Sequence, residues 1–186
     1  QARAPQLATT LTPPFVLGRD LSNEVGITYD PEKARALLTE AGYSDPSAFP
    51  PGTIIVNSAG DIATGAGFNM ASAMAKMWKA NLGVSVQVED LKPPAFRERL
   101  KNNLPDMYRL GWVADVNDPD NFLREIFHSG SQVNYGKFSN SEFDQLVDRA
   151  KRSKDPVERQ ELYILAERLL CETEAAVMPL YRSTFP

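Results

Sequence analysis

The amino-acid sequence predicts an α/β fold, a mixed β-sheet flanked by helices. Three observations carry this prediction: Asp-Pro pairs open amphipathic stretches, short β-like runs lie between those stretches, and the two kinds of segment alternate along 186 residues. Such alternation is typical of a sheet with helices packed on it. A chain of this length suits one domain of ordinary size, and no interior linker is long enough to divide it.

Each predicted helix begins at a capping residue. Aspartate at the N-cap accepts hydrogen bonds from free backbone N–H groups, and proline at the first helical position loses none. Asp30-Pro31, Asp118-Pro119 and Asp155-Pro156 therefore each open a helix. Asp45-Pro46 lies among Ser, Pro and Gly and is interpreted as loop. The other expected helices are Phe68–Leu82, a short one around Ala95–Lys101, and one that follows the capping box Ser139–Glu142.

Four β-like runs are expected as strands. They are Thr53–Asn57, Val84–Leu91, Asp106–Ala114 and Ala175–Tyr181. Pro179 fits best on an edge strand because it cannot donate a ladder hydrogen bond. Residues 1–28 are expected to form an irregular segment that leads into the folded part, residues 29–186. The chain opens on Gln1, which indicates a processed chain or an excised piece.

Composition and charge exclude several classes of function. The formal net charge is −4, and basic residues such as Arg97 are interleaved with acidic ones, so no nucleic-acid partner is expected. No apolar run approaches the ~18–20 residues that span a bilayer. The single cysteine, Cys171, excludes an internal disulfide and a cysteine-rich zinc site, and is expected to be a packed side chain. No metal and no cofactor are predicted.

Catalytic motifs are absent from the sequence. The single histidine, His128, follows an apolar helical stretch and is interpreted as a helix-end residue that can interact with the dipole. The rival class is a hydrolase that pairs Asp115 with a second acid, Asp61 or Glu125. No orienting histidine or metal motif accompanies these carboxylates, so we expect no enzyme.

The most informative stretch runs from Arg109 to Pro119 and is expected to leave a strand, form a loop and enter a capped helix. Ligands of open α/β folds bind outside the carboxyl ends of strands. A carboxylate there, Asp115, could face a cationic ligand group. On a pleated strand Arg109 and Asp115 share one side and Trp112 lies on the other. The local alternatives are a loop-capping role for Asp115 and a core position for Trp112.

Several motifs occur together in the order and spacing of one family. They are Tyr29–Tyr43, Met77–Gly83, Gly111–Asp115 followed by Asp118-Pro119, Asn134, Phe138–Asp144, Asp155–Arg159 and Met178–Tyr181. In these the chain resembles the family 5 solute-binding proteins of bacterial ABC importers, which include the dipeptide- and oligopeptide-binding proteins. The resemblance covers the chain from about Tyr29 to its end.

The resemblance implies the C-terminal lobe (domain III) of a two-lobed protein of the periplasmic-binding-protein type II fold, which closes on its ligand by hinge bending. The implied partners are a peptide or similar small solute, the missing N-terminal lobe and the membrane permease subunits of the importer. The implied location is periplasmic or extracellular, with a lipoprotein anchor in the full-length protein. The family also binds nickel complexes, sugars and other solutes, so these ligands stay open.

The resemblance also implies the residues that bind the ligand. Asp115 occupies the place of an aspartate that meets the α-amino group of a bound peptide, and Trp112 that of a tryptophan lining the same cleft. Arg109 matches an arginine that some members use near the ligand's carboxylate end. Asn117, in the same stretch, and Asn134 complete the predicted set.

Overall fold

The computed structural model describes residues 6–60 and 67–182, and the chain forms two compact units. Tyr29–Gly111 make up one, which we call the sheet unit; the segments up to Thr28 and from Trp112 onward make up the other, the helical unit. Each unit has its own hydrophobic cluster. No linker in the sequence marks the two points where the chain passes from one unit to the other. The division is visible only in the structure, as two separate hydrophobic clusters.

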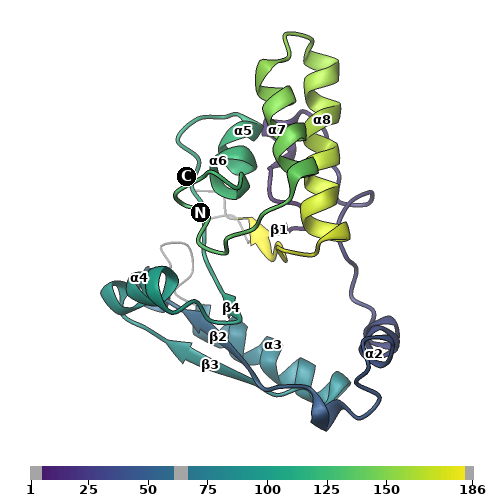
Figure 1. The fold of residues 1–186 in the computed structure, drawn as a ribbon, viewed down its shortest axis with the longest axis vertical. Coiled ribbons are helices and arrows are strands. Elements are labelled where there is room, and N and C mark those ends of the chain that lie inside the picture. The colour runs from purple at the N-terminus through teal and green to yellow at the C-terminus, as the bar shows by residue number, and fades with distance from the viewer. Residues whose placement is uncertain (1–5, 61–66, 183–186) are drawn as a thin grey trace. The chain divides into compact units, whose positions relative to one another are not determined.

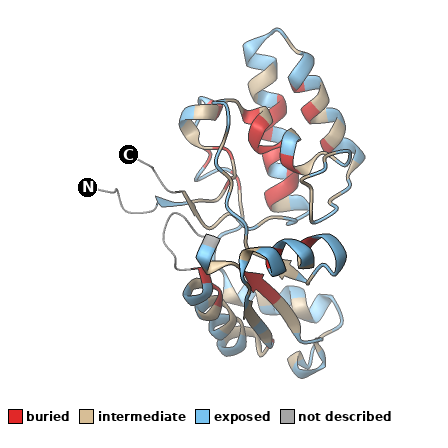
Figure 2. Cartoon of the chain, turned by 90° about the vertical axis from the view of Figure 1, so that its left-hand side faces the viewer, coloured by how far each residue is buried: buried red, intermediate tan, exposed pale blue. Residues whose placement is uncertain are grey.

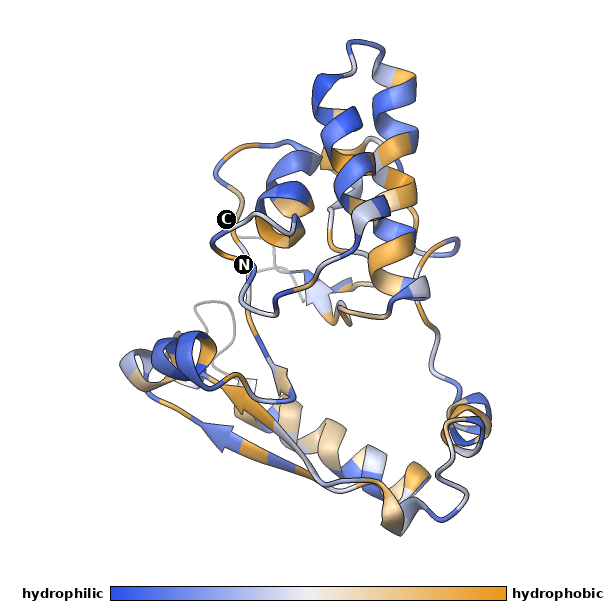
Figure 3. Ribbon diagram, viewed as in Figure 1, coloured by the Kyte–Doolittle hydropathy of each residue, from blue (hydrophilic) through white to orange (hydrophobic). Residues whose placement is uncertain are grey.

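In the sheet unit, β2 (Gly52–Val56) lies between β3 (Val86–Asp90) and β4 (Met107–Tyr108), and both pairings are parallel (Figure 1). Parallel neighbours need a crossover connection, and α3 (Gly67–Leu82) and α4 (Pro93–Asn102) lie in the two crossovers. The central strand β2 is largely hydrophobic, whereas β3 mixes hydrophobic and hydrophilic residues (Figure 3). The other elements of this unit are α2 (Pro31–Glu40) and the short 3₁₀ turns η1 (Pro46–Ala48) and η2 (Ser58–Gly60).

The helical unit is built around a pair of helices, α7 (Ser141–Arg152) and α8 (Pro156–Arg168), that lie side by side (Figure 1). Buried residues gather on these helices (Figure 2), where Phe143 and Tyr163 are fully buried. The other elements of this unit are α1 (Pro14–Leu17), α5 (Pro119–Phe122), α6 (Arg124–Phe127), the π-helical turn η3 (Leu169–Thr173), and β1 (Gln6–Leu7) paired antiparallel with β5 (Tyr181–Arg182). Within residues 6–60 and 67–182, no helix combines the length and the apolar character needed to cross a membrane.

The N-terminal segment is more ordered than the sequence predicts. It contributes Leu17, Leu21 and Val25 to the core of the helical unit. The side chain of Glu167 on α8 is fully buried and accepts hydrogen bonds from the backbone N–H groups of Leu11 and Thr12, at 3.0 and 2.6 Å. The segment is therefore fixed by a long-range polar contact that no local pattern announces.

The Asp-Pro pairs cap helices as predicted. The carboxylates of Asp30, Asp118 and Asp155 accept hydrogen bonds from backbone N–H groups in the first turns of α2, α5 and α8. Asp45-Pro46, predicted as loop, also starts a helical turn, η1, because Asp45 accepts a hydrogen bond from Ser47 N. This turn ends at Phe49, which precedes a proline and is held in extended conformation. The cap of α7 is Asn140, one residue after the predicted Ser139.

Two predicted strands are much shorter in the structure. Of Asp106–Ala114, only Met107–Tyr108 form β4, and the Arg109 N–H adds one more hydrogen bond to Ile55 O at 3.0 Å. β4 pairs with β2 alone, and β2 ends at Val56, so the chain beyond has no ladder to join. Of the run predicted from residue 175, only its end enters β5, which leaves Pro179 outside any strand.

Candidate ligand-binding site

The stretch predicted to bind ligand forms a loop that leads into α5. After β4 and residues 109–111 the chain enters the helical unit at Trp112, where the loop begins. It ends where the Asp118 carboxylate accepts a hydrogen bond from Asp120 N at 2.8 Å and so caps α5. The cap fixes the end of the loop because the carboxylate replaces the partner that the first turn of a helix lacks.

Trp112 and Asp115 are brought together by one side chain, Asn121. Its Oδ1 accepts hydrogen bonds from Trp112 Nε1 at 3.0 Å and from the backbone N–H of Asp115 at 3.2 Å. Asn121 is only 4% exposed, and its Nδ2 donates to a carboxylate oxygen of Glu125 on α6. Trp112 and Asp115, two of the five predicted ligand residues, are therefore parts of one hydrogen-bonded loop.

Sequence reasoning missed Asn121, although two signals pointed to it. The N–H group of an indole that is not fully exposed usually finds a hydrogen-bond partner, and Trp112 lies near several polar side chains in the sequence. Asn121 also stands four residues before Glu125, the spacing that places two side chains on one face of a helix. The first signal does not distinguish Asn121 from its polar neighbours Asp118 and Asp120, and the second is informative only once Glu125 is known to be its partner.

The side chains that the loop presents to solvent are one acid and several apolar groups. Asp115 and Asn117 are exposed, and so are Val113 and Val116, at 65% and 58%. Trp112 is partly buried. An accessible carboxylate beside exposed apolar groups suits a ligand that carries a positive charge and hydrophobic parts. The alternative of a loop-capping Asp115 is not seen, because Asp118 caps α5 and only the backbone of Asp115 is held by Asn121.

The other two predicted residues belong to other segments of the chain. Arg109 belongs to the sheet unit, where it continues the pairing of β4. Asn134 is in the helical unit, and its amide holds a loop together: Nδ2 donates to Phe138 O at 2.8 Å and approaches two carbonyls at the end of α6, while Oδ1 accepts from Phe138 N at 3.0 Å. These contacts make Asn134 a residue that stabilises its own loop, because both sides of its amide are engaged by backbone.

A second group of polar residues supports the loop from α8. Arg159 Nη2 contacts both carboxylate oxygens of Asp118, at 2.8 and 2.9 Å, and lies 3.2 Å from the Tyr163 hydroxyl. The Tyr163 hydroxyl donates to Asp120 at 3.1 Å. Burial raises the pKa of Tyr163, so the hydroxyl keeps the proton that this bond requires. The start of α5 is thus tied to α8 by the side chains of Arg159 and Tyr163.

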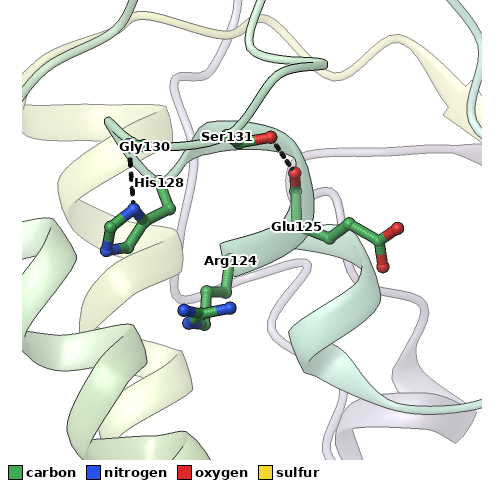
Figure 4. A pocket seen from close by; sticks show the side chains of 5 residues that line it. All are labelled: Arg124, Glu125, His128, Gly130 and Ser131. Atoms are coloured by element: carbon green, nitrogen blue, oxygen red, sulfur yellow. Dashed lines mark hydrogen bonds between the residues drawn. The ribbon is translucent and has the colours of Figure 1, made fainter.

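A small polar pocket of about 290 Å³ lies beside α6 and is lined by Arg124, Glu125, His128, Gly130 and Ser131 (Figure 4). His128 follows the last residue of α6, as predicted, and its Nδ1 accepts a hydrogen bond from Gly130 N at 3.0 Å. Its Nε2 lies 3.7 Å from Asp148, whose pKa is lowered chiefly by a hydrogen bond from Arg124. The contacts of His128 with Gly130 and Asp148 thus hold the end of α6 against its neighbours, which favours the structural interpretation of this residue.

Of the two acids that the hydrolase alternative would pair with Asp115, the structure describes only Glu125. Asp61 lies outside the described residues. Glu125 points away from Arg124 and His128 (Figure 4), and its carboxylate accepts a hydrogen bond from Asn121. Cys171 is buried as predicted, and burial raises the pKa of its thiol. Among the residues that the structure describes, no group of three or more His, Cys, Asp and Glu side chains could hold a metal ion.

Comparison with known proteins identifies the family. The model of the "Bacterial extracellular solute-binding proteins, family 5 Middle" matches residues 3–134. The periplasmic oligopeptide-binding protein OppA of Salmonella typhimurium is 31% identical over 180 residues, which cover 94% of this chain and 31% of that protein. Di/tripeptide-binding protein 1 of Pseudomonas aeruginosa is 31% identical over 186 residues, which cover 97% of this chain and 33% of that protein.

The fold agrees with this assignment. The periplasmic binding protein DppA from Helicobacter pylori, solved in complex with the peptide STSA, matches with a TM-score of 0.80 at 27% identity; the match covers 95% of this chain and 33% of that one. The chain spans about a third of the length of the curated relatives it matches. It belongs to the bacterial extracellular solute-binding proteins of family 5.

Proposed function

We propose that this chain is the C-terminal lobe of an ABC-importer receptor that binds a peptide, or a similar small solute, in a cleft completed by a second lobe. The observation that carries the proposal is the exposed Asp115 carboxylate, on a loop that a buried amide ties to Trp112. Relatives named for binding oligopeptides, dipeptides and tripeptides support a peptide as the ligand.

The proposed roles follow from the chemistry of a peptide. Its α-ammonium group loses water when the lobes close and needs a charged hydrogen-bonding partner, which Asp115 provides. Trp112 offers a flat apolar surface, and Asn117 an exposed amide on the same loop. Arg109 offers a cation for the carboxylate end of the ligand. Asn134 is left out of this set because the backbone of its own loop engages its amide.

The proposed receptor works in the periplasm or outside the cell, where several relatives are located, and delivers its ligand to a membrane permease. A lipoprotein anchor in the full-length protein belongs to the same proposal. Its affinity comes from enclosure and from polar groups that match the ligand, so it needs no catalytic residues. Peptides recovered from the protein should therefore be intact.

A library experiment tests the ligand class. We expect the full-length protein that carries this chain to retain members of an equimolar tripeptide library, detected by native mass spectrometry. An N-acetylated copy of the same library should be retained far less, because acetylation removes the positive charge that Asp115 is proposed to bind. Retention of neither library would contradict a peptide receptor, and equal retention of both would contradict the role of Asp115.

The lobe by itself should bind peptides weakly. A binding site that encloses most of its ligand needs surface on every side, and in the proposed receptor part of that surface belongs to the second lobe. Calorimetry on the isolated chain, with circular dichroism to verify its folding, should give a Kd above roughly 1 μM. Submicromolar binding by a folded isolated chain would rule out a cleft that two lobes share.

A further inference from the structure

The carboxamide oxygen of Asn121 has its hydrogen-bonding capacity used by the loop that carries the proposed site. This oxygen accepts two hydrogen bonds, from the Trp112 indole at 3.0 Å and from the Asp115 backbone at 3.2 Å. An amide oxygen has two lone pairs, so these donors use both. The residue is 4% exposed, so water offers little substitute for either contact. One buried atom therefore fixes the ring of Trp112 and the backbone that carries the Asp115 side chain.

Glu125 favours one of the two orientations of this side-chain amide. Its carboxylate accepts a hydrogen bond from Asn121 Nδ2, and a carboxylate can only accept. If the amide were turned over, its oxygen would face the carboxylate, and its NH₂ group would face the two donors of Trp112 and Asp115. Both contacts would become repulsive. The orientation of Asn121 thus fits the two donors on one side and the charged side chain of Glu125, on α6, on the other.

We infer that Asn121, oriented by Glu125, is the positioning residue of the ligand site: it holds Trp112 and Asp115 in the arrangement that meets the ligand. This inference rests on the proposed function, because it assigns these two residues to binding. Asn121 itself, being buried, acts through them. A change at Asn121 should therefore alter Trp112 and weaken ligand binding together.

The matched pair Asn121→Asp and Asn121→Asp with Glu125→Gln tests this inference. The single change keeps one oxygen for Trp112 and Asp115. It replaces the Nδ2 donor with a second carboxylate oxygen, which then faces the Glu125 carboxylate. The second change restores the bond with its direction reversed, because a glutamine at 125 can donate to an aspartate at 121. We expect the half-saturating concentration of an equimolar tripeptide library to rise about tenfold in the single variant and to return within about threefold in the double variant.

The fluorescence emission of Trp112 separates a local change at the indole from a general loss of stability. As long as the protein stays folded, a lower free energy of unfolding does not by itself change this emission. This chain has two tryptophans, so the emission is measured on the chain itself in a Trp78→Phe background, where Trp112 alone emits, with circular dichroism to verify folding. The single variant should shift the emission and expose the indole to an added quencher, and the double variant should reverse both changes. Tripeptide binding by the wild type and the variants is compared in the full-length protein that carries this chain.

Asn140 provides a matched control in the same unit. Like Asn121, it accepts two hydrogen bonds at Oδ1, here from the backbone N–H groups of Glu142 and Phe143. Its Nδ2 likewise donates to a glutamate, Glu174. Asn140→Asp therefore makes the same chemical change at a helix cap that contacts neither Trp112 nor Asp115. It should leave tripeptide binding within about twofold and the Trp112 emission unchanged, since Asp and Asn cap helices about equally well.

The outcomes separate the inference from the proposed function. Tripeptide binding and Trp112 emission that stay unchanged in Asn121→Asp would overturn the inference and leave the receptor proposal standing. An equal loss in Asn140→Asp, or no rescue by Glu125→Gln, would overturn it as well. If the wild-type protein binds no tripeptide, the receptor proposal fails, and an unrescued emission would show independently that Asn121 does not position Trp112.

Discussion

Replacing Asp115 with alanine in the full-length protein is expected to weaken tripeptide binding by about 2–5 kcal/mol, the usual loss when one partner of an enclosed charge pair is removed. The α-ammonium group of the ligand would then be enclosed without its carboxylate. Isothermal titration calorimetry measures the loss directly. The structure leaves this side chain exposed and uses only the backbone of Asp115 within the loop, so the change should affect binding far more than folding.

Two controls make this expectation specific. Glu161→Ala removes another exposed acid of the helical unit, whose contact with Arg19 is long and solvent-exposed, and should leave affinity unchanged. N-acetylated tripeptides should bind the Asp115→Ala variant and the wild type about equally, because they carry no ammonium group. If Asp115→Ala binds free tripeptides as well as the wild type does, Asp115 is not their partner.

Replacing Glu167 with alanine is expected to lower the free energy of unfolding by about 3–5 kcal/mol, because it leaves two backbone N–H groups without a partner and removes a fully buried acid. The N–H groups are those of Leu11 and Thr12, so the loss should be greatest in the N-terminal segment. Urea unfolding measures the loss, and hydrogen exchange at these two amides locates it. Glu161→Ala, on the exposed side of the same helix, should change stability by less than about 0.5 kcal/mol.

The contribution of Glu167 should also depend on pH. Burial raises the pKa of this carboxyl above its value in the unfolded chain, against the hydrogen bonds from Thr12 and Leu11 that lower it. A raised folded-state pKa means that the folded protein holds the proton more tightly. The stability linked to this proton is fully present below the ordinary glutamate pKa of about 4.3 and declines as the pH rises through the raised value. In Glu167→Gln this decline should vanish, and a wild-type pH profile identical to that of Glu167→Gln would contradict the expectation.

The helix starts that follow Asp-Pro pairs could be predicted because their causes are local. An aspartate before a proline supplies its capping oxygen within one turn, so Asp30, Asp118 and Asp155 act as their sequence indicates. The same local rule explains the one Asp-Pro pair that was misjudged: Asp45 caps a turn even though the prolines after Phe49 stop it at once. Strand lengths could not be predicted, since β4 extends only where β2 offers it a partner.

The sequence by itself determined the α/β class, the family resemblance and the loop that carries Asp115 and Trp112, because these depend on the order and spacing of residues. Three features could be seen only in the folded chain: its two cores, the anchoring of the N-terminal segment by Glu167 from 155 residues away, and the hydrogen bonds of Asn121 to Trp112 and to the backbone of Asp115. The physical reason is that burial makes each of these hydrogen bonds obligatory, and burial is a property of the packed chain that no single stretch of sequence contains.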